Sequence, residues 1–304
     1  MLPEEEMHFN DVTVEQVNDQ QFINAGVKLD VLRLDKIHPV ISGNKGFKLK
    51  YYLQQANEEK YNCVATFGGA FSNHILAAAY ACNKQNIKSI GFIRGEASKN
   101  YSQTLLDAQA LGMQFEFVSR KAFRDKKEIM QANDALYFIP EGGYGATGVK
   151  GAKEITQLVP DLSTYNYIVC AAGTGTMLAG IIQNALPSQE CIGISVMKNN
   201  FSLQTEITSL ISNIEAGKFI LLHDYHFGGY AKYTSPLIDF MNCIWTEHRL
   251  PLDFVYTAKA LYAVYDLLNK KYFLPHSKIL FIHSGGLQGN RSLKKGVLNT
   301  SEQF

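Results

Sequence analysis

The sequence predicts an α/β protein with two lobes, in which twisted sheets of parallel or mixed strands carry helices on both faces. Short apolar segments typical of strands alternate with helix-like segments along the chain, which is the pattern of parallel βαβ units. The chain has 304 residues, of which 46% are hydrophobic and 19% charged, so it can bury a large core. We therefore expect two α/β lobes, and doubly wound sheets bind ligands at the ends of their strands.

The predicted strands are apolar segments that end at turn-forming residues. They are Cys63–Phe67, Ser89–Ile93, Gln114–Val118, Leu136–Ile139, Tyr167–Ala171, Cys191–Val196, Phe219–Leu222 and Lys278–His283. Helices are expected in most of the gaps. They include an amphipathic helix that starts near Lys45, an alanine-rich helix over Ile75–Cys82 and a helix over Met177–Asn184. No internal repeat or low-complexity linker marks a lobe boundary.

The composition excludes several classes of protein. The formal net charge is +1 and no long cluster of Lys and Arg occurs, which argues against binding to nucleic acid or acidic membranes. The five cysteines lack the spacing of a metal site and are expected to be buried thiols of a reducing compartment such as the cytoplasm. The acidic residues 1–6 argue against a signal peptide, and no apolar stretch of roughly twenty residues predicts a membrane span.

Lys45 directly follows the pair Gly43-Asn44, at the start of the first amphipathic helix. A lysine amine must lose its proton before it attacks an aldehyde, and its reference pKa is about 10.4. A desolvated site or nearby cations favour the neutral amine, and Lys48, Lys50 or the helix dipole could supply the charge. Lys45 is therefore a candidate Schiff-base nucleophile. The alternative is a solvated first-turn lysine, with Gly43-Asn44 as a turn and cap.

The segment Thr66–His74 follows the first predicted strand. Gly68-Gly69 would let a ligand approach the backbone closely, and Ser72-Asn73 stand where the alanine-rich helix begins. Unpaired N–H groups at such a helix start bind anions. The alternative is that Ser72 is an ordinary N-cap.

The segment Gly173–Thr176 joins a predicted buried strand to a helix. A strand, a Gly/Thr turn and a helix together form a phosphate cradle of N–H and hydroxyl donors. The third glycine of a dinucleotide fingerprint would fall at Leu178, and no Gly-Lys-Ser/Thr follows, so neither a Rossmann nor a Walker motif fits. A tight connection without a ligand is the alternative.

Together these segments resemble the 1-aminocyclopropane-1-carboxylate deaminase and D-cysteine desulfhydrase family, pyridoxal-phosphate enzymes of the tryptophan-synthase β fold type. The segments that match family motifs are Ser42–Leu49, Gly69–His74, Gly173–Thr176, Val255–Ala260 and Phe281–Gly286. The order of the five motifs is far more specific than any one of them. The resemblance runs from about Val31 to Gly286 and implies a homodimer, since family members commonly form one.

The resemblance implies roles for individual residues. Lys45 would bind the cofactor covalently and later remove the substrate's α-proton, and Asn73 would bond the cofactor's phenolic oxygen. Ser72 would receive the substrate carboxylate, and Tyr230 and Tyr256 would face the substrate. The chain has 16 tyrosines, so a packing role is the alternative for both. The phosphate would lie in the loop formed by Gly173, Thr174, Gly175 and Thr176.

Thr257 and Ser284 carry the expectation about the substrate. In the cyclopropane deaminases the position of Thr257 is a glutamate that pairs with the pyridine nitrogen, and that of Ser284 is leucine. In the D-cysteine enzymes both are threonine. A hydroxyl holds a ring proton less well than a carboxylate, so the cofactor would be a weaker electron sink. Ring opening of a substrate without an α-hydrogen needs the stronger sink.

We therefore expect α,β-elimination from a small amino acid, with D-cysteine as the best single candidate, giving pyruvate, ammonia and sulfide. A 1-aminocyclopropane-1-carboxylate deaminase that releases 2-oxobutanoate and ammonia is the alternative. This chain also departs from the family pattern around the substrate. The departures are Ser42, Gly46-Phe47, Phe71, Ile75–Ala77 and a shortened segment Arg94–Gly112.

The resemblance also places the lobe boundary. Residues 46–140 would form a small lobe inserted into a large lobe of residues 1–45 and 141–304. Pro140–Gly148 would be the return crossing, for which we favour a hinge-like role, and Glu141 has no assigned function because the matching family residue is usually apolar.

Two rival classes remain open at this stage. Ser42-x-x-Lys45 matches the nucleophile motif of penicillin-binding serine hydrolases, although no Lys-Thr-Gly partner exists. A non-catalytic binding protein would keep the phosphate loop without needing Lys45.

Overall fold

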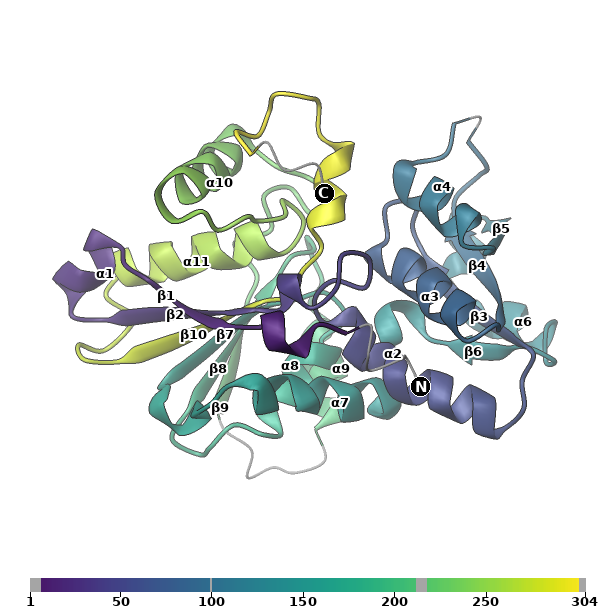
Figure 1. Cartoon of the computed structure of the whole chain (residues 1–304), viewed down its shortest axis with the longest axis horizontal. Coiled ribbons are helices and arrows are strands. Elements are labelled where there is room, and N and C mark those ends of the chain that lie inside the picture. Colours follow the sequence, from purple (N-terminus) through teal and green to yellow (C-terminus); the bar gives the residue numbers. More distant parts are fainter. Residues whose placement is uncertain (1–6, 99, 212–217, 301–304) are drawn as a thin grey trace.

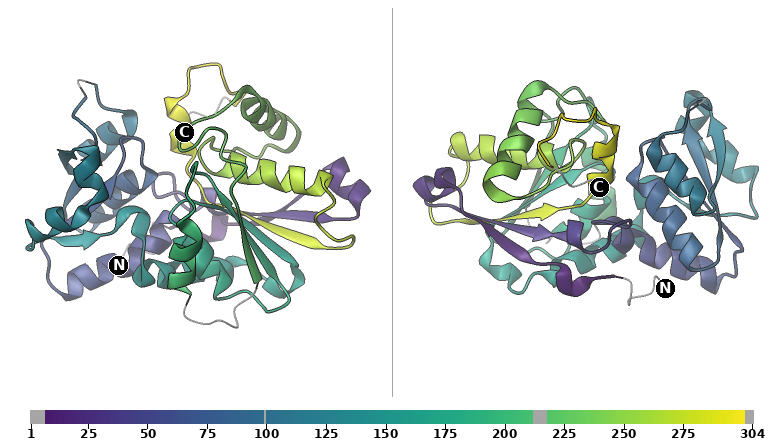
Figure 2. Two further views of the ribbon diagram at one scale, coloured as in Figure 1. Left: turned by 180° about the vertical axis from the view of Figure 1, so that it is seen from behind. Right: turned by 45° about the horizontal axis from the view of Figure 1, so that its top comes forward.

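The protein folds into two α/β lobes, each built around its own sheet (Figure 1). The computed structural model of the chain describes residues 7–98, 100–211 and 218–300. In both views of Figure 2 the blue segments gather in one lobe, and the green and yellow segments gather in the other. The α/β class and the two lobes agree with the prediction from the sequence.

The sheet of the larger lobe has six strands in the order β1-β2-β10-β7-β8-β9. The strands are β1 (Val14–Val17), β2 (Lys28–Arg33), β7 (Tyr167–Ala172), β8 (Glu190–Ser195), β9 (Lys218–Leu222) and β10 (Lys278–His283). Neighbouring strands run parallel, except β1 and β2, which pair antiparallel. Every residue of β7 is buried, because a central parallel strand is covered on both faces and needs a continuous apolar sequence.

Helices cover both faces of the large sheet (Figure 1). On one face lie α1 (Gln20–Ala25), α10 (Ser235–His248) and α11 (Thr257–Asn269). On the other lie α7 (Ala146–Ala152), α8 (Thr176–Ile182) and α9 (Leu203–Leu210). Side chains alternate along a strand, so Val169 and Ala171 of β7 enter the first core while Ile168 and Cys170 enter the second.

The sheet of the small lobe has four parallel strands in the order β5-β4-β3-β6. The strands are β3 (Cys63–Gly68), β4 (Lys88–Arg94), β5 (Gln114–Val118) and β6 (Tyr137–Ile139). One face packs on α2 (Lys45–Glu58), α3 (Asn73–Lys84) and α4 (Gln103–Ala110). The other packs on α5 (Arg120–Arg124) and α6 (Lys126–Gln131), around a cluster that contains Phe67, Phe92 and Phe123.

Short 3-10 helices connect several of these elements. They are η2 (Phe9–Asp11), η3 (Leu34–Lys36), η4 (Glu141–Gly143), η5 (Lys153–Leu158), η6 (Leu162–Thr164) and η7 (Leu287–Ser292). Of the helices that the structure describes, none combines the length and the apolar character needed to span a membrane.

Each strand predicted from the sequence is present, but the prediction missed β1 and β2. Strand β2 contains the charged residues Asp30 and Arg33, both buried, which hide its apolar character. Asp30 pairs with Lys278 (2.9 Å), and Arg33 pairs with Glu15 (2.7 Å). These partners neutralise the buried charges only after the chain has folded, so a local pattern does not reveal the strand.

The two lobes meet where α2 packs against α7. The two helices touch through their backbones, because a Cβ on Gly151 would lie only 1.8 Å from the carbonyl oxygen of Phe47. The chain returns to the large lobe through η4, where Gly142 and Gly143 have φ of +66° and +67°. Because α2 contacts both lobes, the boundary at residues 46–140 stays a prediction.

We predict that Gly151→Ala destabilises the protein by about 2–4 kcal/mol, because the added methyl group must push α7 away from α2. Urea unfolding followed by circular dichroism measures the change. Gly289→Ala is the matched control, because a Cβ there meets its nearest described atom at an ordinary 3.8 Å, from Val255. Equal stability of the two variants would contradict the backbone contact.

Candidate active site

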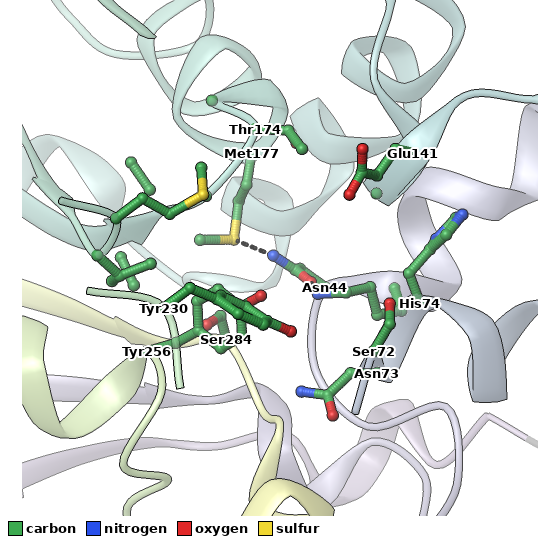
Figure 3. A pocket seen from close by; sticks show the side chains of 18 of the residues that line it. Asn44, Ser72, Asn73, His74, Glu141, Thr174, Met177, Tyr230, Tyr256 and Ser284 are labelled. Carbon is green, nitrogen blue, oxygen red and sulfur yellow. Dashed lines mark hydrogen bonds between the residues drawn. The ribbon is translucent and has the colours of Figure 1, made fainter. Parts of the chain in front are cut away.

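A cavity of about 350 Å³ lies between the lobes, at the carboxyl ends of the central strands (Figure 3). The large lobe contributes residues that follow β7 and β10, and the small lobe contributes residues that follow β3 together with Arg94, the last residue of β4. The cavity brings together most of the residues predicted from the sequence. Those on its wall are Lys45, Ser72, Asn73, Gly173, Thr174, Gly175, Tyr230, Tyr256 and Ser284.

Lys45 is the first residue of α2 and points into this cavity. Burial lowers the pKa of its amine to about 8, and the charge of Asp253 opposes this effect. Burial is thus the main cause, rather than the neighbouring cations suggested by the sequence. Lys50 in particular is not placed to help, because its ammonium pairs with Glu154 at 2.9 Å.

Asn44 positions the amine of Lys45. The Lys45 Nζ donates a hydrogen bond to Asn44 Oδ1 (2.6 Å), and Asn44 Nδ2 contacts the sulfur of Met177 at 3.0 Å (Figure 3). The Asn44 side chain does not cap α2, so the alternative of a simple turn and cap does not describe it. A reactive amine next to a polar anchor can form a bond with an aldehyde.

Lys48 is a second buried lysine on the cavity wall, which the sequence analysis did not single out as a ligand-binding residue. Its Nζ donates to the carbonyl of Gly142 at 3.4 Å, and none of the described carboxylates forms an ion pair with it. Burial, together with the charge of Lys45, holds the pKa of Lys48 well below its usual value. A buried cation without an acid is costly, and a bound anion would offset that cost.

The glycine and threonine loop after β7 lies on the same side of the molecule as Gly142. Gly175 has φ of +77° and precedes α8, while a Cβ on Gly142 would meet Thr174 Cγ2 at 2.8 Å. Thr176 is fully buried, and unlike the other three predicted loop residues it does not line the cavity. Its hydroxyl lies 3.2 Å from that of Thr174. The loop and Lys48 together form a site whose donor groups fit a phosphate.

Ser72 and Asn73 stand at the start of α3, as predicted. The Ser72 hydroxyl makes no capping hydrogen bond with its helix, which leaves it available on the cavity wall. The side-chain oxygen of Asn73 is buried and has no partner in the described structure. A buried unpaired amide oxygen is unfavourable unless a ligand meets it.

His74 follows in the same turn and also lacks one partner. Its Nε2 lies 2.8 Å from the hydroxyl of Thr66, which itself donates to the carbonyl of Ile139. Nε2 therefore carries the proton, and Nδ1 is a buried acceptor without a described partner. Burial lowers the pKa of His74 to about 3, so the ring is neutral at physiological pH.

Tyr230 and Tyr256 face each other across 6.2 Å between ring centres. The Lys45 Nζ lies 5.8 Å from the centre of the Tyr256 ring. Burial raises the pKa of both phenols, so they act as neutral hydrogen-bonding groups. The fully buried Lys259 supports the Tyr230 loop by donating to the carbonyl of Gly229 at 2.7 Å.

Thr257 and Ser284 do not occupy equivalent places. Ser284 reaches the cavity wall, while Thr257 is fully buried behind it. The Thr257 hydroxyl donates to Asp253 Oδ1 (2.7 Å), and Asp253 also accepts N–H groups at the start of α11. The contact of Thr257 with the cofactor ring stays a prediction, and any such contact would have to share or replace the hydrogen bond of the Thr257 hydroxyl to Asp253. Asp253 was missed, although an acidic residue ahead of a helix is a common N-terminal signal.

Ser42 does not stand where a nucleophile would. It is buried, and its hydroxyl donates to the carbonyl of Asp35 at 3.3 Å. The serine hydrolase alternative therefore lacks its central residue.

Comparison with known proteins identifies the family. The family described as pyridoxal-phosphate dependent enzyme matches residues 22–285, and this chain belongs to it. A Thermotoga maritima protein provisionally named 1-aminocyclopropane-1-carboxylate deaminase is 30% identical over 290 residues, covering 87% of this chain and 90% of that protein. The bifunctional D-cysteine desulfhydrase/1-aminocyclopropane-1-carboxylate deaminase of Arabidopsis thaliana is 27% identical, covering 87% of this chain and 73% of that protein.

A solved structure described as an ACC deaminase homologue is similar in fold. Its TM-score is 0.79 with 26% identity, over 92% of this chain and 90% of that chain. The protein is therefore a pyridoxal-phosphate dependent enzyme with the tryptophan-synthase β type of fold, and the resemblance stated from the sequence is confirmed. The aldehyde of the cofactor suits Lys45, and its phosphate suits Lys48 and the loop after β7.

We predict that Lys45→Met stabilises the cofactor-free protein by about 1–3 kcal/mol at pH 7. The folded protein loses the Lys45 proton near pH 8, but the unfolded chain keeps it until about pH 10.5. The cost of the buried charge is complete below pH 8 and disappears as the pH rises towards 10.5, so the gain should shrink there. Urea unfolding at pH 7 and pH 9.5 measures this.

Lys50→Met is the matched control for this measurement. Its ammonium is paired at the surface with Glu154, so we expect a change of less than about 1 kcal/mol. A loss of stability in Lys45→Met at pH 7 would mean that the amine is not desolvated.

We also predict that Lys48→Met weakens binding of pyridoxal phosphate by roughly 10- to 100-fold, because a charged hydrogen bond to the phosphate is lost. Absorbance titration of the cofactor-free protein measures the affinity. Pyridoxal, which lacks the phosphate, should bind both proteins equally. A similar loss for pyridoxal would assign Lys48 a structural role instead.

Proposed function

We propose that this enzyme catalyses α,β-elimination from a small amino acid with a β leaving group, with D-cysteine as the best single candidate, giving pyruvate, ammonia and sulfide. The observation that supports this most directly is the Ser284 hydroxyl on the cavity wall. The nearby carboxylate, Asp253, is buried behind the wall and occupied by hydrogen bonds from α11. A wall that offers a hydroxyl suits substrates that have an α-hydrogen and need a weaker electron sink.

Each residue of the cavity would have a separate role in the reaction. Lys45 binds the cofactor and accepts the α-proton, and its low pKa makes the amine an effective base near neutral pH. Ser72 and the N–H groups that follow it receive the substrate carboxylate. Tyr230 and Tyr256 donate hydrogen bonds to the β-substituent. When bound, pyridoxal phosphate withdraws electrons from the α-carbon.

The names of the relatives include both candidate activities. A protein of Salmonella choleraesuis named D-cysteine desulfhydrase is 26% identical, covering 84% of this chain and 86% of that protein. The Thermotoga maritima relative carries the cyclopropane deaminase name instead. A 1-aminocyclopropane-1-carboxylate deaminase is therefore the second candidate function.

We predict that the purified holoenzyme releases pyruvate and sulfide from D-cysteine at least about tenfold faster than it releases 2-oxobutanoate from the cyclopropane amino acid. A tenfold ratio of rates corresponds to a difference of only about 1.4 kcal/mol in activation free energy. Coupled dehydrogenase assays measure both oxo acids. Lys45→Ala should abolish both activities and leave the cofactor bound without a covalent link, so borohydride no longer fixes it to the chain. Faster release of 2-oxobutanoate would favour the second candidate.

A further inference from the structure

Arg94 is a cation of the small lobe that lines the cavity and has no acidic partner among the described residues. It is the last residue of β4, and its Nη2 lies 3.9 Å from the place where a Cβ on Gly69 would stand. Its guanidinium carbon lies 5.7 Å from the ring centre of Phe123. These contacts hold the guanidinium beside the turn that leads from Gly69 to Ser72.

The neighbouring charges do not neutralise Arg94. Glu141 also lines the cavity, but its carboxylate pairs with Lys126 at 3.1 Å. The ammonium of Lys126 lies 4.6 Å from the centre of the same Phe123 ring that supports Arg94. This rim of the small lobe therefore carries two cations and one anion, and one positive charge is left over.

The other anions expected in the cavity already have partners. The cofactor phosphate would meet Lys48 and the loop after β7, and the substrate carboxylate would meet Ser72 and the start of α3. Glu206 of α9 is a further acid on the cavity wall. It lies on the side of the phosphate loop, because Leu203 and Ile207 of the same helix would contact a Cβ on Gly175. Neither the phosphate nor the carboxylate therefore accounts for Arg94.

Arg94 also acts on the opposite wall of the cavity. Burial raises the pKa of Tyr230, and a hydrogen bond from Tyr256 and the charge of Arg94 oppose that rise. Arg94 and Tyr230 thus line the same cavity, Arg94 on the small-lobe side near the Gly69 turn and Tyr230 on the large lobe. A substrate with its carboxylate at Ser72 and its α-carbon near Lys45 would extend its β-substituent into this space.

We propose that Arg94 binds the β-substituent where that group carries or develops negative charge, as a phosphate ester or the departing sulfur of a thiol does, so that acidic β-substituents are preferred over neutral ones. This inference rests on the proposed function, because it takes the same cavity as the elimination site. Arg94 is then the residue that selects acidic over neutral substrates.

The proposal has a chemical consequence for cysteine. A free thiol has a pKa of about 8.5, so at neutral pH cysteine carries its sulfur mainly as the protonated thiol. During elimination the α C–H bond breaks and its proton passes to Lys45. The Cβ–S bond then breaks with its electron pair on sulfur, and a Cα=Cβ double bond forms. The thiol sulfur keeps its own proton and leaves as hydrosulfide, HS−, and Arg94 stabilises the negative charge that develops on it.

Titration of the holoenzyme with aspartate and asparagine, as both enantiomers, tests the inference without turnover. The two amino acids are nearly isosteric, neither has a β leaving group, and only aspartate carries the β-charge. The visible absorption change of the cofactor reports the affinity. We expect the wild type to bind aspartate at least about tenfold tighter than asparagine, as one charged hydrogen bond allows.

Arg94→Gln should remove this preference and leave asparagine affinity within about twofold, while Arg94→Lys should keep part of it. Equal binding of the two ligands by the wild type, binding of neither, or an unchanged preference in Arg94→Gln would overturn the inference. A clear preference for aspartate together with no product from D-cysteine or the cyclopropane amino acid would overturn the proposed function alone.

Discussion

The active site depends on a backbone contact between the loop before α2 and the loop after β10. The N–H of Asn44 donates to the carbonyl of Ser284 at 3.3 Å, and a Cβ on Gly43 would lie 1.8 Å from that oxygen. Gly285 has φ of +72°, and a Cβ there would lie 2.7 Å from the nitrogen of Gly43. Only glycine lets the two backbones come this close, and their contact fixes the position of Lys45 relative to Ser284 on the cavity wall.

Several polar groups around this contact are more costly to the folded protein than apolar ones would be. Lys45 and Lys48 are desolvated amines, and Asn73 and His74 each bury an atom without a described partner. Each of these groups lines the cavity between the lobes. Selection for function retains such groups at the expense of stability, because the ligand supplies the missing contacts.

Most of the fold could be predicted because its central strands are apolar along their whole length. Strands such as β7 and β10 are covered by helices on both faces, and that environment requires continuous hydrophobic sequence. Strands β1 and β2 escaped prediction because charged side chains, such as Glu15 and Arg33, which pair with each other, replace part of their apolar sequence. Arg33 and Glu15 are 18 positions apart and belong to different strands, so a local pattern carries no trace of their pairing.

The sequence by itself determined the chemistry of this protein, because its reactive groups lie in short motifs whose backbone shape depends on neighbouring residues. These motifs contain Lys45, Ser72-Asn73 and Gly173–Thr176. Tertiary structure alone decided which charges meet in the cavity. In the folded protein Lys50 forms a partly exposed ion pair with Glu154, and Thr257 is buried against Asp253. Arg94 lines the cavity without an acidic partner among the described residues. The reason is physical: desolvation and Coulomb forces act through space, between side chains that separate elements bring together.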